Sequence, residues 1–158
     1  MWFGVNRLGE LRHTVPDLRA AHGSFSESRL ATPEAVRLIR DSVADYASGV
    51  GIEGSRLEDV RLVVSEAVAN VVIHAYRDQP GPVHVIANVV DSELWVLIAD
   101  EGVGNNVPTR RPGLGLGLAL MTKMSDGFTL VDRAEGGTEA RLRFLIPSSP
   151  QQITRAGQ

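Results

Sequence analysis

The chain contains no cysteine in its 158 residues, so disulfide bonds and thiolate zinc sites are excluded. Aromatic residues make up only 5% of the chain and hydrophobic residues 43%, which predicts an aliphatic core rich in alanine. No apolar run approaches the roughly 18 residues that a membrane span requires. The first residues also lack the hydrophobic core of a signal peptide. We therefore expect a cytoplasmic protein with no membrane partner.

An excess of basic charge is also missing, since 16 basic and 19 acidic residues give a formal net charge of −3. No basic stripe with interleaved aromatic residues is present, so we expect no nucleic-acid partner. The length favours one domain with a sizeable core. The pattern of the sequence divides the chain into an N-terminal extension (1–24), a folded domain (25–147) and a disordered polar tail (148–158).

Hydrophobic periodicity and turn residues predict the order β-α-α-β-β-α-β-β. Thr32-Pro33 is a helix start, Ser55-x-x-Glu58 is typical of a capping box, and Asp91-Ser92 separates two strands of a hairpin. This order predicts an α+β two-layer sandwich, with a mixed, mostly antiparallel sheet and three helices on one face. The expected strands are 25–30, 83–90, 93–99, 127–131 and 139–146, and the expected helices are 33–49, 55–76 and 114–124.

Residues 100–118 contain two glycine clusters after an apolar strand. Asp100 at the strand end is followed by Gly102 and Gly104, and a second cluster then alternates glycine with leucine over 113–117. Glycine lets the backbone approach a ligand closely, and amides at a helix start favour phosphate. An ionised aspartate accepts hydrogen bonds, as the adenine amino group requires. The alternative is a turn, a flexible loop and a glycine-tolerant helix start, but two clusters favour nucleotide binding.

Three polar residues of the second expected helix, Glu66, Asn70 and His74, follow one another at a spacing of four and therefore share one stripe. The structural alternative is a hydrogen-bonded row in the core, and we favour it for His74. The side-chain oxygen of Asn70 suits Mg²⁺, which takes substrate phosphates as further ligands. Glu66, one turn earlier, is suited to accept a proton from an attacking hydroxyl beside the γ-phosphate.

Four motifs follow in order: E-x-x-x-N on a helix, D-x-G-x-G after a strand, G-x-G-x-G, and Gly137-Thr138 opening a strand. With them the chain resembles the Bergerat-fold ATPases, which include gyrase, mismatch-repair ATPases and histidine kinases. The run from Glu66 to Asn70 that closes on His74-Ala75-Tyr76, and the small size, resemble the anti-sigma-factor serine kinases in particular. The resemblance covers residues 25–146.

The resemblance implies that the chain binds ATP and Mg²⁺. Asn70 would hold the metal, Glu66 would be the general base, and Asp100 would receive the adenine amino group, with Thr138 completing that contact through water. Gly102 and Gly104 would let the chain bend around the base. The second cluster would present amides to the phosphates; its members are Gly113, Leu114, Gly115, Leu116 and Gly117.

The resemblance further implies a protein serine/threonine kinase that binds a sigma factor or a comparable regulator and phosphorylates a serine on a small antagonist protein. A homodimer is also expected in this family. The loop between Gly104 and Gly113 is short for a lid. Arg110 or Arg111 in this loop would contact phosphate, or both are solvated loop residues. Two alternatives stay open: an ATP hydrolase that uses Glu66, and a nucleotide-dependent sequestering module without catalysis.

Overall fold

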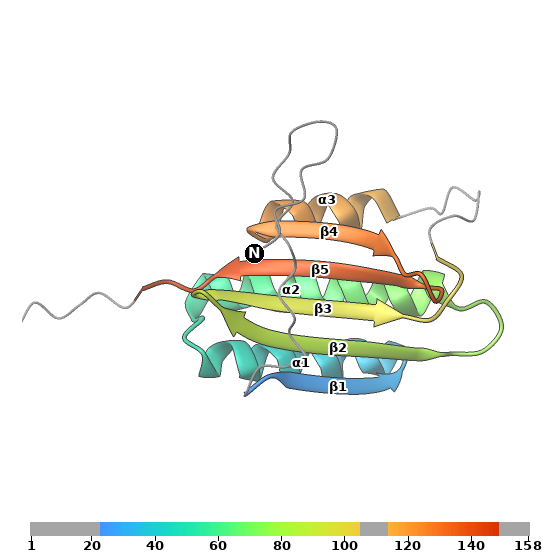
Figure 1. The fold of residues 1–158 in the computed structure, drawn as a ribbon, viewed down its shortest axis with the longest axis horizontal. Helices are drawn as coiled ribbons and strands as arrows, with labels where there is room; N and C mark the ends of the chain where they lie inside the picture. The colour runs from blue at the N-terminus through green and yellow to red at the C-terminus, as the bar shows by residue number, and fades with distance from the viewer. Residues whose placement is uncertain (1–22, 105–113, 149–158) are drawn as a thin grey trace, which may run out of the picture.

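The computed structural model describes residues 23–104 and 114–148. The expected N-terminal extension and tail lie almost wholly outside these ranges, so the predicted division of the chain stays a prediction. Figure 1 shows a twisted sheet with the helices on one of its faces. The elements are β1 (Phe25–Leu30), α1 (Pro33–Gly49), α2 (Gly54–Asn70), η1 (Val71–Ala75), β2 (Pro82–Val90), β3 (Glu93–Asp100), α3 (Leu114–Met124), β4 (Gly127–Asp132) and β5 (Thr138–Leu145).

The five strands lie in the order β1-β2-β3-β5-β4, and every neighbouring pair is antiparallel. The α+β sandwich is therefore confirmed, but the sheet of the described residues is antiparallel rather than mixed. The reason is the position of β5. The chain crosses from β3 through α3 to β4, and β5 then inserts between these two strands, so they are not neighbours.

Local sequence signals explain most element boundaries. Pro33 opens α1, and both hairpin residues between β2 and β3 have positive φ, 49° at Asp91 and 63° at Ser92, as a tight hairpin turn requires. The expected capping box of the second helix is wrong. The amide of Leu57 donates to the carbonyl of Glu53 at 3.4 Å, so α2 begins at Gly54, ahead of Ser55, and no side chain caps it.

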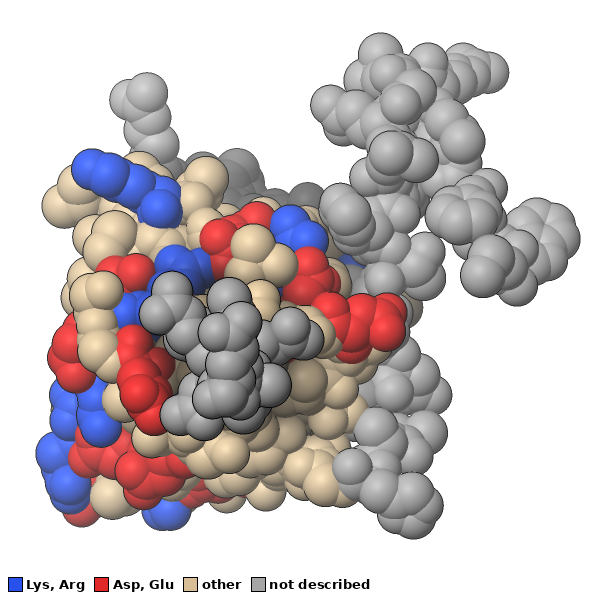
Figure 2. Space-filling model, turned by 90° about the vertical axis from the view of Figure 1, so that its left-hand side faces the viewer, with Lys and Arg blue, Asp and Glu red and all other residues tan. Residues whose placement is uncertain are grey.

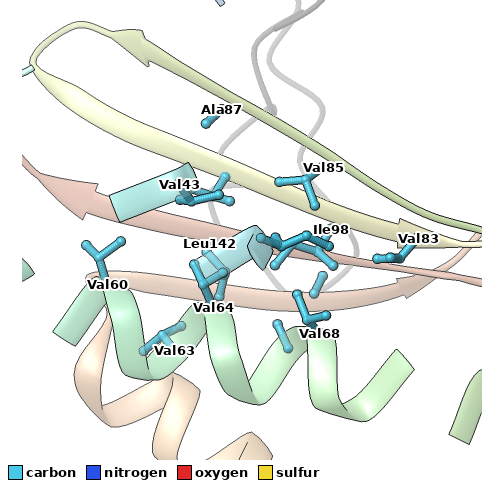
Figure 3. Close-up of a cluster of buried hydrophobic side chains, with 14 of the residues drawn as sticks. Val43, Val60, Val63, Val64, Val68, Val83, Val85, Ala87, Ile98 and Leu142 are labelled. Carbon is cyan, nitrogen blue, oxygen red and sulfur yellow. The ribbon is translucent and has the colours of Figure 1, made fainter. Parts of the chain in front are cut away.

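The core lies between the sheet and α1 and α2, and it is aliphatic as expected (Figure 3). Helix α2 contributes a row of fully buried valines that packs against the facing side of β2, β3 and β5. Each fully buried side chain of this size stabilises the fold by about 1.5–3 kcal/mol. The side chains that Figure 3 shows in this layer include Val43, Val60, Val64, Val68, Val83, Val85, Ile98 and Leu142.

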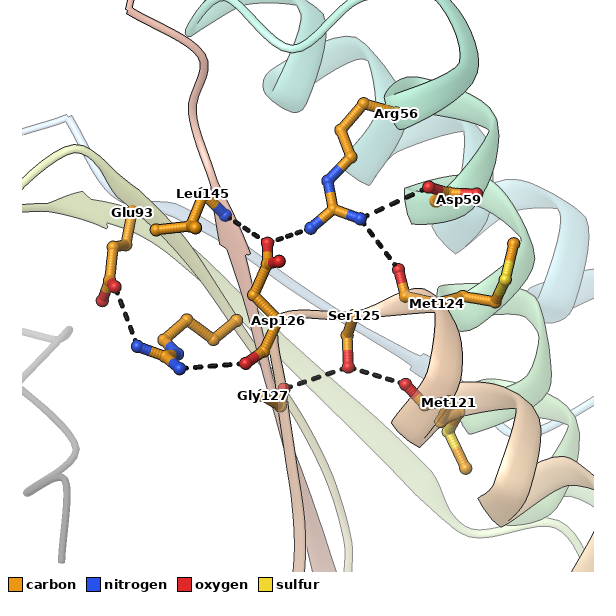
Figure 4. A network of polar contacts seen from close by, with 10 residues as sticks. Arg56, Asp59, Glu93, Met121, Met124, Ser125, Asp126, Gly127 and Leu145 are labelled. Carbon is orange, nitrogen blue, oxygen red and sulfur yellow. Dashed lines mark hydrogen bonds and ion pairs between the residues drawn. The ribbon is translucent and has the colours of Figure 1, made fainter. Parts of the chain in front are cut away.

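A polar network fastens the C-terminal end of α3 to α2 and the sheet (Figure 4). Arg56 in the first turn of α2 donates to the carbonyl of Met124 at 3.1 Å and pairs with the carboxylate of Asp126. Its guanidinium also lies 5.3 Å from the ring centroid of Phe144. The same Asp126 carboxylate accepts from the amide of Leu145 at 2.7 Å. These contacts fix where α3 lies against α2.

On the face in Figure 2, acidic and basic side chains are interspersed and do not separate into patches of one sign. This distribution agrees with the small net charge of the sequence. Within the described ranges, no helix has the length and apolar character needed to cross a membrane.

Candidate functional site

A cavity lies between the helical layer and the sheet, where α2 passes into η1. It brings together residues from both predicted motifs: Asn70 from the helix, Asp100 and Gly104 from the end of β3, and Thr138 from the start of β5. Its remaining lining is mostly aliphatic, so a planar apolar group with a polar edge would suit it. That lining consists of Ala67, Val71, His74, Ala75, Ile98, Met121, Leu130 and Ala140.

Asp100 is held at the base of this cavity with a side chain that is almost fully buried. Its Oδ1 accepts from the amide of Gly102 at 2.8 Å, and its Oδ2 accepts from the hydroxyl of Thr138 at 2.6 Å. Its carbonyl accepts from Nη1 of Arg133 at 2.7 Å. The Thr138 hydroxyl therefore lies on the Asp100 carboxylate, and its expected contact to adenine through water stays a prediction.

Gly102 packs directly on the backbone of η1. A Cβ at this position would lie 2.1 Å from the carbonyl oxygen of Ala75, and the next amide, of Val103, donates to that same oxygen at 3.0 Å. Close approach is therefore what requires glycine at position 102. Gly104 has a φ of 72°, which agrees with the predicted bend at that residue.

Glu66 and Asn70 both lie against Gly117 of α3. A Cβ on Gly117 would be 3.1 Å from Glu66 Oε2 and 3.7 Å from each polar side-chain atom of Asn70. Both side chains are only partly buried, and no hydrogen bond to either is found among the described residues. Neither side chain is fully enclosed in the core, and the choice between the site and the structural alternative of a core row stays a prediction.

The helix changes character directly after Asn70. Residues Val71–Ala75 form the π-helical turn η1, whose hydrogen bonds span five residues, so the α-helical stripe is not continued to His74. The side chain of His74 nevertheless lines the cavity. Such π turns inside helices are frequent at functional sites. We expected an unbroken helix to Tyr76, and that expectation is wrong.

The second glycine cluster is described only in part. Arg110, Arg111 and Gly113 lie outside the described residues. Helix α3 begins at Leu114, so the amides of its first turn have no acceptor within the helix. Gly115 has open space around it and Leu116 is 81% exposed, whereas Gly117 is buried against Glu66.

The antiparallel sheet covered by helices on one face, with a strand-end aspartate and a helix asparagine around one cavity, is the arrangement of an ATP-binding domain of the Bergerat class. The model of the histidine kinase-like ATPase domain family matches residues 30–144. The chain belongs to this family, as the sequence motifs predicted.

Individual relatives agree with this assignment. The chain is 33% identical over 121 residues to the anti-sigma F factor of Clostridium acetobutylicum, an alignment that covers 70% of this chain and 85% of the relative. It is 37% identical over 131 residues to the serine-protein kinase RsbW of Bacillus licheniformis, covering 73% of this chain and 81% of the relative.

A crystal structure of the RsbU and RsbW domains of Rv1364c from Mycobacterium tuberculosis has a similar fold, with a TM-score of 0.65. The identity is 23%, and the likeness covers 83% of this chain and 34% of that one.

Two residues beside the site were missed in the sequence. Arg133, in the connection between β4 and β5, reaches the carbonyl of Asp100, and no local pattern marks it. Tyr76 follows η1, and its hydroxyl donates to the carbonyl of Pro82 and accepts from the amide of Glu101, the residue after Asp100. An aromatic residue directly before the polar break at residues 77–81 was the signal available for it.

Proposed function

We propose that the chain is an ATP- and Mg²⁺-dependent protein serine/threonine kinase of the anti-sigma-factor type. It binds a sigma factor or a comparable regulator and phosphorylates a serine on a small antagonist protein. Membership of the ATPase family and the similarity to an anti-sigma factor and a serine-protein kinase support this function. The observation that carries it is the position of Glu66 and Asn70, which meet α3 together at Gly117, next to the cavity that contains Asp100.

The residues present suit a nucleotide with its metal. The carboxylate of Asp100, which is held by Thr138, accepts a hydrogen bond from the adenine amino group. The amides in the first turn of α3 are suited to donate hydrogen bonds to phosphate oxygens. The described residues include no cluster of three or more His, Cys, Asp or Glu side chains that could hold a metal alone. Mg²⁺ is commonly held by a single protein oxygen together with substrate phosphates and water, so the Asn70 side chain fits this role.

Asn70 would hold Mg²⁺, which would supply neutralisation of the phosphate charge during transfer. In the protein, Glu66 accepts the proton of the incoming serine hydroxyl as that oxygen attacks the γ-phosphorus and ADP leaves. Its carboxylate is partly exposed and lies beside Gly117 of α3. Because Gly117 has no side chain, the Glu66 carboxylate can lie close to the backbone near the start of α3.

Binding of the base requires the cavity to widen. Its volume is about 40 Å³, which at roughly 10–15 Å³ per molecule holds about three waters. Residues 105–113 and α3 form one connection between β3 and β4, and we expect the beginning of α3 to move when nucleotide enters. Arg110 or Arg111 then contacts phosphate from this connection. The homodimer expected for this family remains a prediction.

Substitution of Glu66 by Gln separates chemistry from binding. We expect Glu66→Gln, which keeps the size of the side chain, to retain Mg-ATP affinity in calorimetry. Its single-turnover transfer rate should fall by on the order of 10²–10⁴, the usual range for a positioned acid–base group. Asn70→Ala should lose binding and transfer together, because a metal ligand is removed.

Glu58→Gln is the matched control, since Glu58 is on the same helix and its side chain is 73% exposed. It should transfer phosphate at the parent rate. If Glu66→Gln does so too, Glu66 is not the base, and a sequestering module without catalysis becomes the better interpretation. If phosphate is released to water with no labelled protein, the chain is a hydrolase of the same fold.

A further inference from the structure

Tyr76 joins the start of β2 to the residue that directly follows Asp100 of the cavity. Its hydroxyl donates to the carbonyl of Pro82, the first residue of β2, at 2.6 Å. The same oxygen accepts from the amide of Glu101 at 2.9 Å, directly after the cavity residue Asp100. One side chain therefore fixes the end of β3 relative to the start of β2, at a point where the two strands no longer pair.

The ring of Tyr76 is itself held in place by Gly81. A Cβ at position 81 would lie 2.1 Å from Cε1 of the ring, so any residue larger than glycine there would displace the ring. Burial raises the pKa of the Tyr76 hydroxyl, and the negative charges of Asp100 and Glu101 add to this effect. The hydroxyl thus keeps the proton that it donates to Pro82 throughout the neutral range.

The hydrogen bonds of the neighbouring amides explain why the contact between Tyr76 and Glu101 affects Asp100. The amide of Gly102 donates to the Asp100 carboxylate, and the amide of Val103 donates to the carbonyl of Ala75. Tyr76 holds the amide between Asp100 and Gly102, that of Glu101. The three successive amides of residues 101–103 are therefore each fixed by a different acceptor, and the first of them donates to the tyrosine hydroxyl.

We propose that Tyr76 is a positioning residue for base recognition: it holds the strand-end corner at residues 100–102, so that the Asp100 carboxylate stays oriented toward the amino group of adenine. This inference rests on the proposed function. It concerns the selection of the base and not the transfer of phosphate. Loss of the hydroxyl should loosen this corner and reduce discrimination between bases, while the phosphate contacts and Glu66 stay in place.

The test compares ATP with inosine triphosphate, which carries a carbonyl where adenine carries its amino group. Both nucleotides are titrated with Mg²⁺ into the full chain and into Tyr76→Phe. The ratio of the two affinities should fall by about 3- to 10-fold in the variant, as expected for the loss of one hydrogen bond. The transfer rate at saturating ATP should stay within about twofold of the parent.

Tyr46→Phe is the matched control, because Tyr46 also donates to a backbone carbonyl, that of Gly23 at 3.2 Å, on another part of the molecule. It should keep the parent ratio. If Tyr76→Phe fails to fold, Gly81→Ala displaces the ring without removing the hydroxyl and should lower the ratio in the same way. An unchanged ratio in the folded variant overturns the inference. A parent chain that does not prefer ATP overturns the proposed adenine contact instead.

Discussion

Replacing Gly117 by alanine should make the protein more stable and less active at the same time. Gly117 lies inside α3, and alanine is about 0.8–1.0 kcal/mol more favourable than glycine in a helix interior. The new Cβ would lie 3.1 Å from Glu66 Oε2, a contact tight enough that this flexible carboxylate must shift by a few tenths of an ångström. The shift costs little stability because Glu66 is only partly buried.

The displaced carboxylate is nevertheless the proposed base. A misplacement of 1 Å can lower a rate by about 10²-fold, so a smaller shift should lower single-turnover transfer by roughly 10-fold. The gain in stability should raise the melting temperature by roughly 2–4 °C. Both quantities are measured on the same preparation, by calorimetry and by transfer of labelled phosphate.

Gly115→Ala is the comparison within the same helix, because a Cβ there would meet no atom within 4 Å. It should not move Glu66, and its gain in melting temperature should be smaller because Gly115 lies in the first turn of α3; its transfer should exceed that of Gly117→Ala. If Gly117→Ala is as active as Gly115→Ala, the contact between α3 and Glu66 has no part in catalysis. A large loss of stability in Gly117→Ala would instead show that the Glu66 side chain cannot move away from the new Cβ.

Three further outcomes are expected. Asp100→Ala leaves the Thr138 hydroxyl and the adenine amino group without an acceptor and should weaken ATP binding by roughly 1–3 kcal/mol in titration calorimetry; unchanged affinity would place adenine elsewhere. Arg56→Ala should lower the free energy of unfolding in urea by about 1–3 kcal/mol through its bonds to Met124 and Asp126, whereas Arg37→Ala, which removes an exposed pair, should cost less than about 0.5 kcal/mol. Burial raises the pKa of Tyr46 and Tyr76 above the ordinary 10.0. The free energy of unfolding that these two groups contribute should therefore be fully present below pH 10 and decrease as the pH rises through the raised pKa values. This decrease should be smaller when both residues are phenylalanine.

The parts of the site that depend on local spacing were predictable from the sequence. A separation of four residues places Glu66 and Asn70 on one side of a helix whatever the rest of the chain does. Pro33 favours the first turn of a helix, and the pair Asp91-Ser92 favours a turn. The bounds of α1 and of the β2–β3 hairpin were therefore predicted close to those observed. The aliphatic core follows from composition.

The parts that depend on strand register were not predictable in this way. Thr138 contacts Asp100 directly because β3 and β5 are neighbouring strands, with Ala99 opposite Glu139. These two strands are separated in the sequence by α3 and β4. Arg133 reaches Asp100 through the same arrangement. The π turn at Val71–Ala75 has no simple sequence signal, since these residues continue a helical pattern, and the contact of Ala75 with Val103 forms only in the folded chain.

The most direct test of the account follows the γ-phosphate of labelled ATP. The chain is incubated with Mg²⁺, labelled ATP and a lysate of its own cells, and the labelled proteins are separated and analysed for phosphoamino acids. We expect phosphoserine on one small protein, and no such label when Glu66→Gln replaces the parent chain. Release of inorganic phosphate without a labelled protein, or label that is unaffected by Glu66→Gln, would contradict it.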